Sequence, residues 1–224
     1  MNPIECLESR RLLAASATLL GTTLLVRGDE LAANAIDVTY NVDGVHVDVA
    51  VVSTPLIGSP VSLNQQFIKA DITMVKVRGG RVADDIDLST LTTNSRVNGV
   101  SGADSISTGS GNDRIAGGGG GDLINAGAGN DLVHGERGND SISGGEGDDA
   151  LWGGVGEDTI NGGAGHDILG GLLGTNVLTG GADADTFVIK PGGQSQASDF
   201  VDGVDAYRIR TTGSTDGSVP PPTA

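Results

Sequence analysis

The chain is poor in cysteine and in aromatic side chains, and both shortages exclude common ways of building a protein. It contains one Cys, three Phe, two Tyr and one Trp among 224 residues. With so few large core-forming side chains, an ordinary globular interior is not expected. Because Cys6 is the single cysteine, no intrachain disulfide and no cysteine-based metal site can form. We interpret Cys6 as an incidental residue of the N-terminal segment.

Basic side chains are scarce in one long segment. Residues 99–188 carry 14 acidic and 2 basic side chains, which is −12 of the formal net charge of −16. Such a segment repels nucleic acid and anionic membranes and attracts cations. The charge distribution therefore predicts that nucleic acid is not a partner and that a cation is.

The motifs of common catalytic sites are also missing. The sequence has no G-x-S-x-G, no H-E-x-x-H and no G-x-x-x-x-G-K. The three histidines, His46, His134 and His166, are scattered. We therefore predict that the protein is not an enzyme.

Glycine, by contrast, is abundant and periodic. With Asp104 as position six of a nine-residue unit, one frame runs from Gly99 to Val188 without insertion and gives ten units. Position four is glycine in nine units, and position eight is apolar in all ten. Position six is aspartate in nine units and Asn176 in the other. A flexible glycine-rich linker, the alternative, has no reason to keep three positions in phase.

The nine-residue period predicts a coiled all-β fold. Six glycine-rich residues suit a turn, and the remaining three suit a short strand whose middle residue, at position eight, faces inward. Two units then make one coil, so the array forms about five coils, stacked about 4.8 Å apart. We predict a right-handed parallel β-roll, or solenoid.

Stacking places units n and n+2 on the same edge, so their aspartates form two columns of negative charge. A divalent cation between each stacked pair neutralises two carboxylates. Ca²⁺ takes six to eight oxygen ligands in irregular geometry, whereas Mg²⁺ needs a stricter octahedron and Zn²⁺ prefers histidine or cysteine. We predict several Ca²⁺ ions as cofactors and an array that folds when it binds them.

The unit G-G-x-G-x-D-x-U-x resembles the calcium-binding nonapeptide repeat of the RTX, or haemolysin-type, family. The resemblance implies ions between the turns of units n and n+2. Their ligands are two position-six side chains, carbonyls of positions two and four from one turn, and carbonyls of positions one and three from the other. At most about eight ions fit. The last ion positions along the array, which we call slots, differ from the others. Asn176 lacks charge, and Leu172 and Asp183 replace turn glycines.

The candidate metal ligands that follow from this resemblance are Asp104, Asp113, Asp122, Asp131, Asp140, Asp149, Asp158, Asp167, Asn176 and Asp185 at position six, with Gly102, Gly111, Gly117, Gly120, Gly129, Gly135, Gly138, Gly144, Gly147, Gly153, Gly156, Gly162 and Gly165 through their backbones.

The N-terminus has features of an export segment. Arg10 and Arg11 precede an apolar stretch from Leu12 to Val26, and Ala33–Ala35 offers a small-x-small cleavage site. A first β-strand within this stretch, closed by Gly28, is the other interpretation, and the two are compatible. The segment LESRRLLA, at 7–14, resembles the LEPR-x-LL motif of bacterial exported proteins, with serine in place of proline.

The flanks of the array also predict strands. Residues 36–52 alternate around Asp43-Gly44, which favours a hairpin, and 68–77 favours another strand. Residues 79–87 fit the nonapeptide frame, after which eleven residues break its phase. Downstream, the residues from Asp199 to Asp205 resemble the D-F-x-x-G-x-D segment that closes RTX blocks, so we expect a terminal cap.

We therefore divide the chain into an export-type segment (1–26), a degenerate β-solenoid or small β domain (27–98), the β-roll (99–188), a C-terminal β cap (189–212) and a disordered tail (213–224). The predicted function is a secreted or cell-surface calcium-binding structural or interaction module. The alternative is the non-catalytic calcium-binding or secretion segment of a secreted hydrolase or toxin. A neighbouring reading frame with a catalytic motif favours the alternative.

Overall fold

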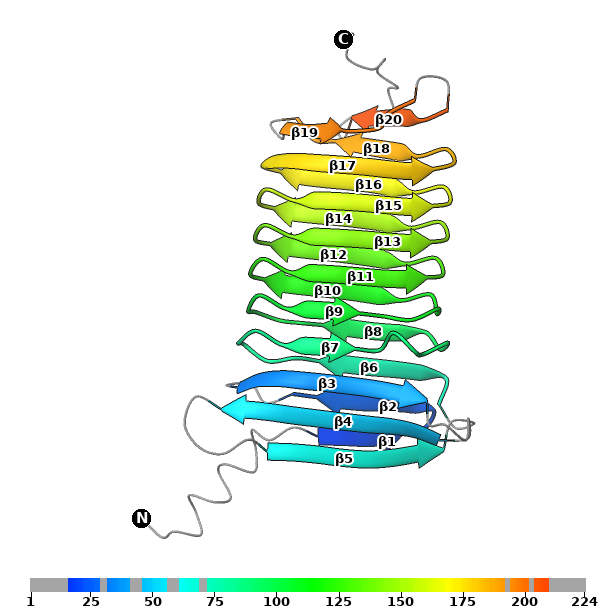
Figure 1. The fold of residues 1–224 in the computed structure, drawn as a ribbon. Helices are drawn as coiled ribbons and strands as arrows, with labels where there is room; N and C mark the ends of the chain where they lie inside the picture. Colours follow the sequence, from blue (N-terminus) through cyan, green and yellow to red (C-terminus); the bar gives the residue numbers. More distant parts are fainter. Residues whose placement is uncertain are drawn as a thin grey trace.

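The computed structural model describes residues 16–28, 32–40, 46–55, 61–68, 72–191, 194–201 and 204–209. Within these residues the chain forms strands and turns but no helix, and it winds into a β-solenoid of about seven turns (Figure 1). This part of the chain accordingly contains no helix long and apolar enough to cross a membrane. The predicted all-β solenoid is confirmed.

Two ten-stranded sheets form opposite faces of the solenoid. Sheet A contains, in spatial order, β1 (Ser16–Leu20), β2 (Thr23–Arg27), β6 (Met74–Arg78), β8 (Ser95–Asn98), β10 (Arg114–Gly119), β12 (Leu132–Arg137), β14 (Ala150–Val155), β16 (Ile168–Leu173), β18 (Thr186–Ile189) and β20 (Ala206–Ile209). Sheet B contains β19 (Gln194–Ala197), β17 (Thr175–Ala182), β15 (Thr159–Ala164), β13 (Ser141–Glu146), β11 (Leu123–Ala128), β9 (Ser105–Ser107), β7 (Asp85–Asp87), β3 (Ala32–Tyr40), β4 (His46–Pro55) and β5 (Val61–Ile68).

From β6 onward the chain alternates between the sheets, and each coil adds one parallel strand to each. Within the array, partners lie eighteen residues apart, as in the pairs Ile115 with Val133 and Ile124 with Ile142. One coil is therefore two nonapeptide units, as the sequence predicts.

The strands of the array are longer than expected. Strands β10 to β16 each contain six residues, covering positions seven to nine of one unit and one to three of the next. The prediction of a three-residue strand and a six-residue turn was wrong, and the turn is limited to positions four to six. Glycine permits this, because a Cβ on Gly118 would collide with the Val100 carbonyl of the preceding coil. Without that Cβ, the backbones of stacked coils approach closely enough to pair.

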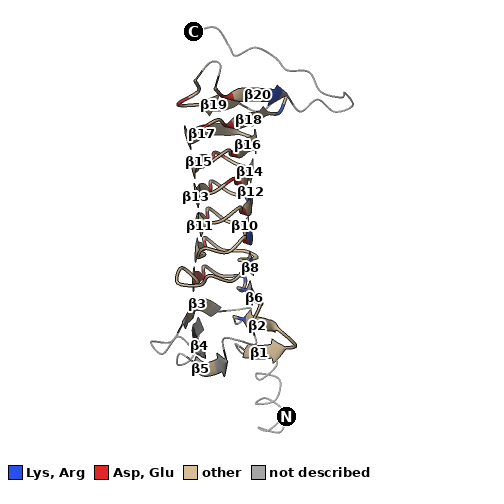
Figure 2. Ribbon diagram, turned by 90° about the vertical axis from the view of Figure 1, so that its right-hand side faces the viewer, with Lys and Arg blue, Asp and Glu red and all other residues tan. Residues whose placement is uncertain are grey.

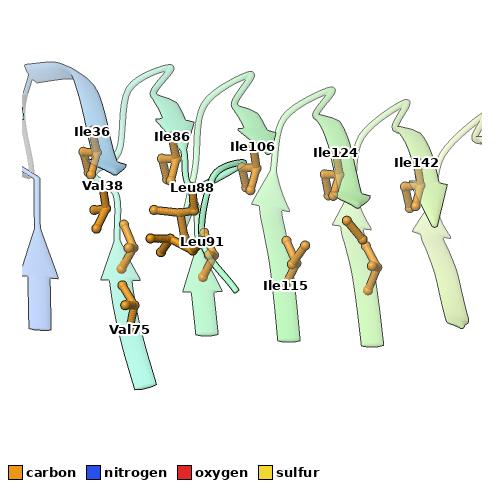
Figure 3. Close-up of a cluster of buried hydrophobic side chains, with 14 of the residues drawn as sticks. Ile36, Val38, Val75, Ile86, Leu88, Leu91, Ile106, Ile115, Ile124 and Ile142 are labelled. Carbon is orange, nitrogen blue, oxygen red and sulfur yellow. The ribbon is translucent and has the colours of Figure 1, made fainter. Parts of the chain in front are cut away.

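The core is a stack of position-eight side chains between the two sheets (Figure 3). Ile106, Ile115, Ile124, Val133, Ile142, Leu151, Ile160, Leu169, Leu178 and Phe187 are all buried. Each contributes about 2 kcal/mol by burial. The predicted inward direction of position eight is confirmed.

The solenoid continues upstream of the array. Residues 90–98 form a further unit, with Ser95 at position six and Val97 at position eight, so the expected loss of phase is only a two-residue insertion. One inserted residue, Leu88, is fully buried beside Leu91. The insertion therefore enlarges the core locally while the winding persists.

The N-terminal strands complete this end of the solenoid. Strand β2 carries buried Leu24 and Val26, ends at Arg27 and pairs in parallel with β6, so the strand interpretation holds here. Strands β3 and β4 pair antiparallel, as the hairpin prediction requires, and β5 extends them. The small-x-small segment at 33–35 lies in β3. The LESRRLLA segment at 7–14 lies outside the described residues.

An aromatic cluster closes the other end. The ring of Phe187 lies 6.1 Å from that of Phe200 and 5.8 Å from that of Tyr207, and Phe200 stacks on Tyr207 at 4.4 Å. Strands β19 and β20 add a last coil in parallel to β17 and β18. The segment expected to form a cap therefore covers the last rung of the core. The predicted disordered tail at 213–224 lies outside the described residues.

Candidate metal sites

The position-six side chains lie in two columns, one along each turn edge of the solenoid. Edge 1 carries Asp104, Asp122, Asp140, Asp158 and Asn176, and edge 2 carries Asp113, Asp131, Asp149, Asp167 and Asp185. In Figure 2, red segments repeat along the turns of the array. All ten side chains are at most 3% exposed. The fold therefore withdraws nine aspartates from water, which is costly unless each carboxylate is neutralised or bound.

One oxygen of each of these side chains accepts a hydrogen bond from the coil before it. The backbone N–H of Asp122 donates to Oδ1 of Asp140 at 2.8 Å, and that of Asp140 donates to Oδ1 of Asp158 at 3.0 Å. On edge 2 the N–H of Asp131 donates to Oδ1 of Asp149 at 2.8 Å. These bonds fix the side chains in one orientation along each column.

The second oxygen has no such partner. Oδ2 is buried without a hydrogen-bond partner in eight aspartates: Asp104, Asp113, Asp122, Asp131, Asp140, Asp149, Asp158 and Asp167. These are the residues that have another position-six side chain eighteen residues downstream in the array. Eight buried carboxylate oxygens without a donor are far more than a stable fold leaves unsatisfied. Each requires a proton or a cation.

Position-one glycine leaves space next to that oxygen. A Cβ on Gly135 would collide with Asp140 Oδ2 and lie 2.7 Å from the carbonyl oxygen of Gly153 in the next coil. A Cβ on Gly99 would likewise meet Asp104 Oδ2 and the Gly117 carbonyl, the latter at 2.5 Å. We call the space beside each position-one glycine a cradle. Each cradle lies next to a carboxylate oxygen of one coil and a carbonyl oxygen of the next, the two ligands that a bridging cation needs.

Turn glycines let backbone carbonyls of one coil approach the turn of the next. Gly102, Gly120 and Gly138, all at position four, have φ of 119°, 134° and 127°. A Cβ on Gly120 would collide with the Gly102 carbonyl, and one on Gly138 with the Gly120 carbonyl. Most turns share this positive φ, and Asp183, at position four of the last unit, adopts it with φ of 77°, so its replacement of glycine keeps the turn geometry. Leu172 lies at position two within β16 and keeps the positive φ of that position, 69°, as Gly154 does.

Burial raises the pKa of the column aspartates. The pKa of Asp104, Asp131 and Asp149 rises to about 7, and that of Asp122, Asp158 and Asp167 to about 6. Loss of solvation is the largest cause, and neighbouring carboxylates, mainly of the same column, add to it. In the absence of metal, these groups take up protons near neutral pH.

The donor atoms fit a hard cation. No group of three or more His, Cys, Asp or Glu side chains gathers in the described part of the chain, so backbone oxygens must supply much of any coordination shell. Carboxylate and carbonyl oxygens are the ligands of Ca²⁺, whereas Zn²⁺ prefers nitrogen and sulfur. The residues therefore fit Ca²⁺.

The two columns extend beyond the array, to residues that the sequence analysis did not predict as members. On edge 1, Asp84 N–H donates to Asp104 Oδ1, and Asn34 N–H donates to Asp84 Oδ1, each at 2.8 Å. On edge 2, Ser95 stands before Asp113, and Asp205 follows Asp185. The fit of residues 79–87 to the nonapeptide frame was the available indication for Asp84. Nothing in the sequence pattern indicated Asn34.

Stacked coils with oxygen-lined turns define a calcium-binding β-roll. Residues 98–133, 134–169 and 161–188 match the family of RTX calcium-binding nonapeptide repeats. Segment 98–188 thus matches the RTX calcium-binding nonapeptide repeats, which confirms the resemblance of the nonapeptide array to that family. No curated protein matches the chain.

Proposed function

We propose that this chain is a secreted calcium-binding β-roll that serves as a structural or interaction module, without catalytic activity, at or outside the cell surface. The repeat array folds when Ca²⁺ binds between stacked turns. One observation carries the proposal: eight buried Oδ2 atoms without a hydrogen-bond partner. No polar side chain or backbone N–H compensates them, so a cation is the simplest partner.

Each slot takes its ligands from two stacked turns. Between the coils of Gly135 and Gly153, for example, Oδ2 of Asp140 and the Gly153 carbonyl contribute, with Asp158 and the position-four carbonyl of Gly138. The pattern repeats four times on each edge, which gives eight slots for the eight Oδ2 atoms. The slots that end at Asn176 and Asp185 complete the two columns.

Export agrees with this chemistry. Extracellular calcium modules have dissociation constants of about 10⁻⁴ to 10⁻³ M. Such an array therefore remains unfolded in the cytosol and folds outside the cell. The arginine-then-apolar N-terminus and the LESRRLLA segment support the same location. The partner of the module is then an extracellular or cell-surface component.

Calcium titration tests the proposal directly. Metal-free protein is titrated with Ca²⁺, folding is followed by far-ultraviolet circular dichroism, and bound calcium is counted by equilibrium dialysis. We expect cooperative gain of β-structure and about eight bound ions per chain. Mg²⁺ at the same concentration is the control and leaves the array unfolded. A fully folded spectrum in EDTA, or folding without bound calcium, contradicts the proposal.

A further inference from the structure

The outward face of sheet A carries a cluster of cations at its N-terminal end, near β6, β8 and β10 (Figure 2). Lys76, Arg96 and Arg114 are neighbours in one column of register partners, and Arg27 stands beside this column next to Arg78. Arg27, Arg96 and Arg114 are exposed. In the described strands from β2 to β20, these two columns, at positions seven and nine, contain no Asp or Glu. These two columns are therefore basic although the protein is strongly acidic.

The outward face of sheet B has the opposite charge at the same end. Asp37 in β3 is the register partner of Asp87 in β7, and Asp85 lies two residues before Asp87. All three side chains are exposed. In the described strands from β3 to β19, the corresponding two columns contain no Lys or Arg. Burial, and then the nearby charges of Asp87 and Asp48, raise the pKa of Asp37.

The two charges come from the same coils. The coil of β2 and β3 places Arg27 on sheet A and Asp37 on sheet B, at equal height along the solenoid. The coil of β6 and β7 likewise carries Lys76 on one face and Asp85 on the other.

Apolar side chains match in the same way at the other end. In the coil of β16 and β17, Ile168 and Leu173 on sheet A are each 37% exposed, and Val177 on sheet B is 43% exposed. A second copy moved sideways, without any shift along the axis, therefore brings the basic end of sheet A level with the acidic end of sheet B, and the apolar groups level with one another.

We propose that the basic face of sheet A docks on the acidic face of sheet B of a second copy of this chain. The contact is heterologous, so it continues from copy to copy and forms a row of parallel solenoids rather than a closed dimer. A two-fold pairing of sheet A with itself sets cations against cations or against Ile168 and Leu173. An anionic polymer matches the basic face but leaves the aspartates of sheet B without a cation.

Exposed ion pairs are individually weak and are screened by salt, so this association is concentration-dependent and strongest at low ionic strength. Sedimentation velocity of the calcium-loaded full chain measures it. We expect the average mass to rise with concentration in low salt and to return to the monomer value in high salt. A chain that stays monomeric at all concentrations in low salt overturns the proposal.

Charge reversal identifies the two faces. The pair Lys76→Glu and Arg96→Glu makes sheet A acidic, and the pair Asp85→Lys and Asp87→Lys makes sheet B basic. Each double variant alone loses association, because its two faces then carry the same charge. An equimolar mixture of the two regains it, because every contact in an alternating row again joins opposite charges.

A matched control distinguishes the effect of the charged faces from the effect of net charge. Lys190→Glu with Arg137→Glu changes the net charge as much as the sheet A variant does but leaves both charged clusters intact, so it still associates. Circular dichroism in Ca²⁺ checks that each variant is folded. Association that survives in either reversed variant, or a mixture that stays monomeric, overturns the proposal. So does a monomer whose Lys76 and Arg96 bind heparin, since the face then serves an anionic polymer.

Discussion

The coils before residue 99 and the repeat array wind in the same way, yet they treat the same carboxylate differently. Asp84 in the upstream coil accepts hydrogen bonds at Oδ1 from the backbone N–H and the Nδ2 of Asn34, each at 2.8 Å, and at Oδ2 from Gly80 N–H at 2.5 Å. Asp140 in the array accepts one at Oδ1, whereas its Oδ2 has none. A buried aspartate therefore needs a cation only where the turn points no N–H at its second oxygen.

The cores of the two regions differ in the same sense. The array offers one large apolar side chain per nonapeptide. The upstream region adds Leu88 and Leu91 inside one coil and packs the β3–β4–β5 ladder on the stack through Val47, Val49 and Val51. Because the upstream region buries more apolar surface and both oxygens of Asp84 are hydrogen-bonded, we expect it to be stable without metal.

Removal of calcium is the strongest way to separate the regions. In EDTA, we expect amide hydrogen exchange across 105–182 to speed up by at least about a hundredfold, while 72–98 keeps its protection. The physical reason is that only the array loses ligands when the ion leaves. Hydrogen exchange with mass spectrometry resolves both regions in one sample.

Re-addition of Ca²⁺ is the control and restores the protection. If both regions lose protection together, the upstream coils depend on the array, and the comparison fails. If neither loses it, the Oδ2 atoms are satisfied without metal.

A change of pH gives the next largest effect. In the metal-free array, burial raises the pKa of Asp104 and Asp131 from 3.8 to about 7 and that of Asp122 to about 6. A raised carboxyl pKa means that the folded state binds more protons than the unfolded state. The resulting stability is complete below about pH 4 and is lost as the pH rises through about 6 to 7.

We therefore expect the array in EDTA to be more structured at about pH 5 than at about pH 8, because protons then replace the cation. With Ca²⁺ present, the calcium midpoint rises several-fold over the same decrease in pH, because protons compete for the ligands. Circular dichroism in EDTA and in calcium buffers measures both. Replacing Asp122 and Asp140 with Asn removes two titrating groups and reduces both effects. A metal-free spectrum that does not change with pH contradicts this account.

The sequence was sufficient where the repeat is regular. The period, the inward residue at position eight and the stacking of aspartates all follow from one frame, because each unit repeats the same local geometry. The length of the strands could not be predicted from this frame, since glycine at positions one to three suits a turn and a closely paired strand equally well. Asn34 could not be predicted because it lies 50 residues before its partner Asp84, in a strand outside the nonapeptide frame. The edges of the array also differ in ways that the frame hides.

On edge 2, position one is Thr108 and Ala126 in the first two units of the array and glycine in the other three, and position-five residues form a second column of hydrogen bonds. Ala126 is fully buried and places a real Cβ where other coils leave the cradle open. On the same edge, Asn130 N–H donates to Asn112 Oδ1 at 3.1 Å and His166 N–H donates to Asp148 Oδ1 at 2.9 Å. Edge 1 has open glycine cradles throughout the array and one such position-five bond among its described residues. Edge 1 therefore depends more on the cation than edge 2.

A pair of opposite substitutions sharpens this last comparison. Gly135→Ala puts a Cβ against Asp140 Oδ2, so we expect loss of about one bound ion and a higher calcium midpoint. Gly119→Ala is the matched control, because its Cβ meets only Ser101 Oγ, at 4.0 Å, and the bound calcium stays the same. Ala126→Gly opens an edge 2 cradle, so it lowers the calcium midpoint slightly even though glycine raises the entropy cost of folding. Equal midpoints for Gly135→Ala and Gly119→Ala show that the cradle is not where the ion binds, and then the two edges do not differ in the way their glycines suggest.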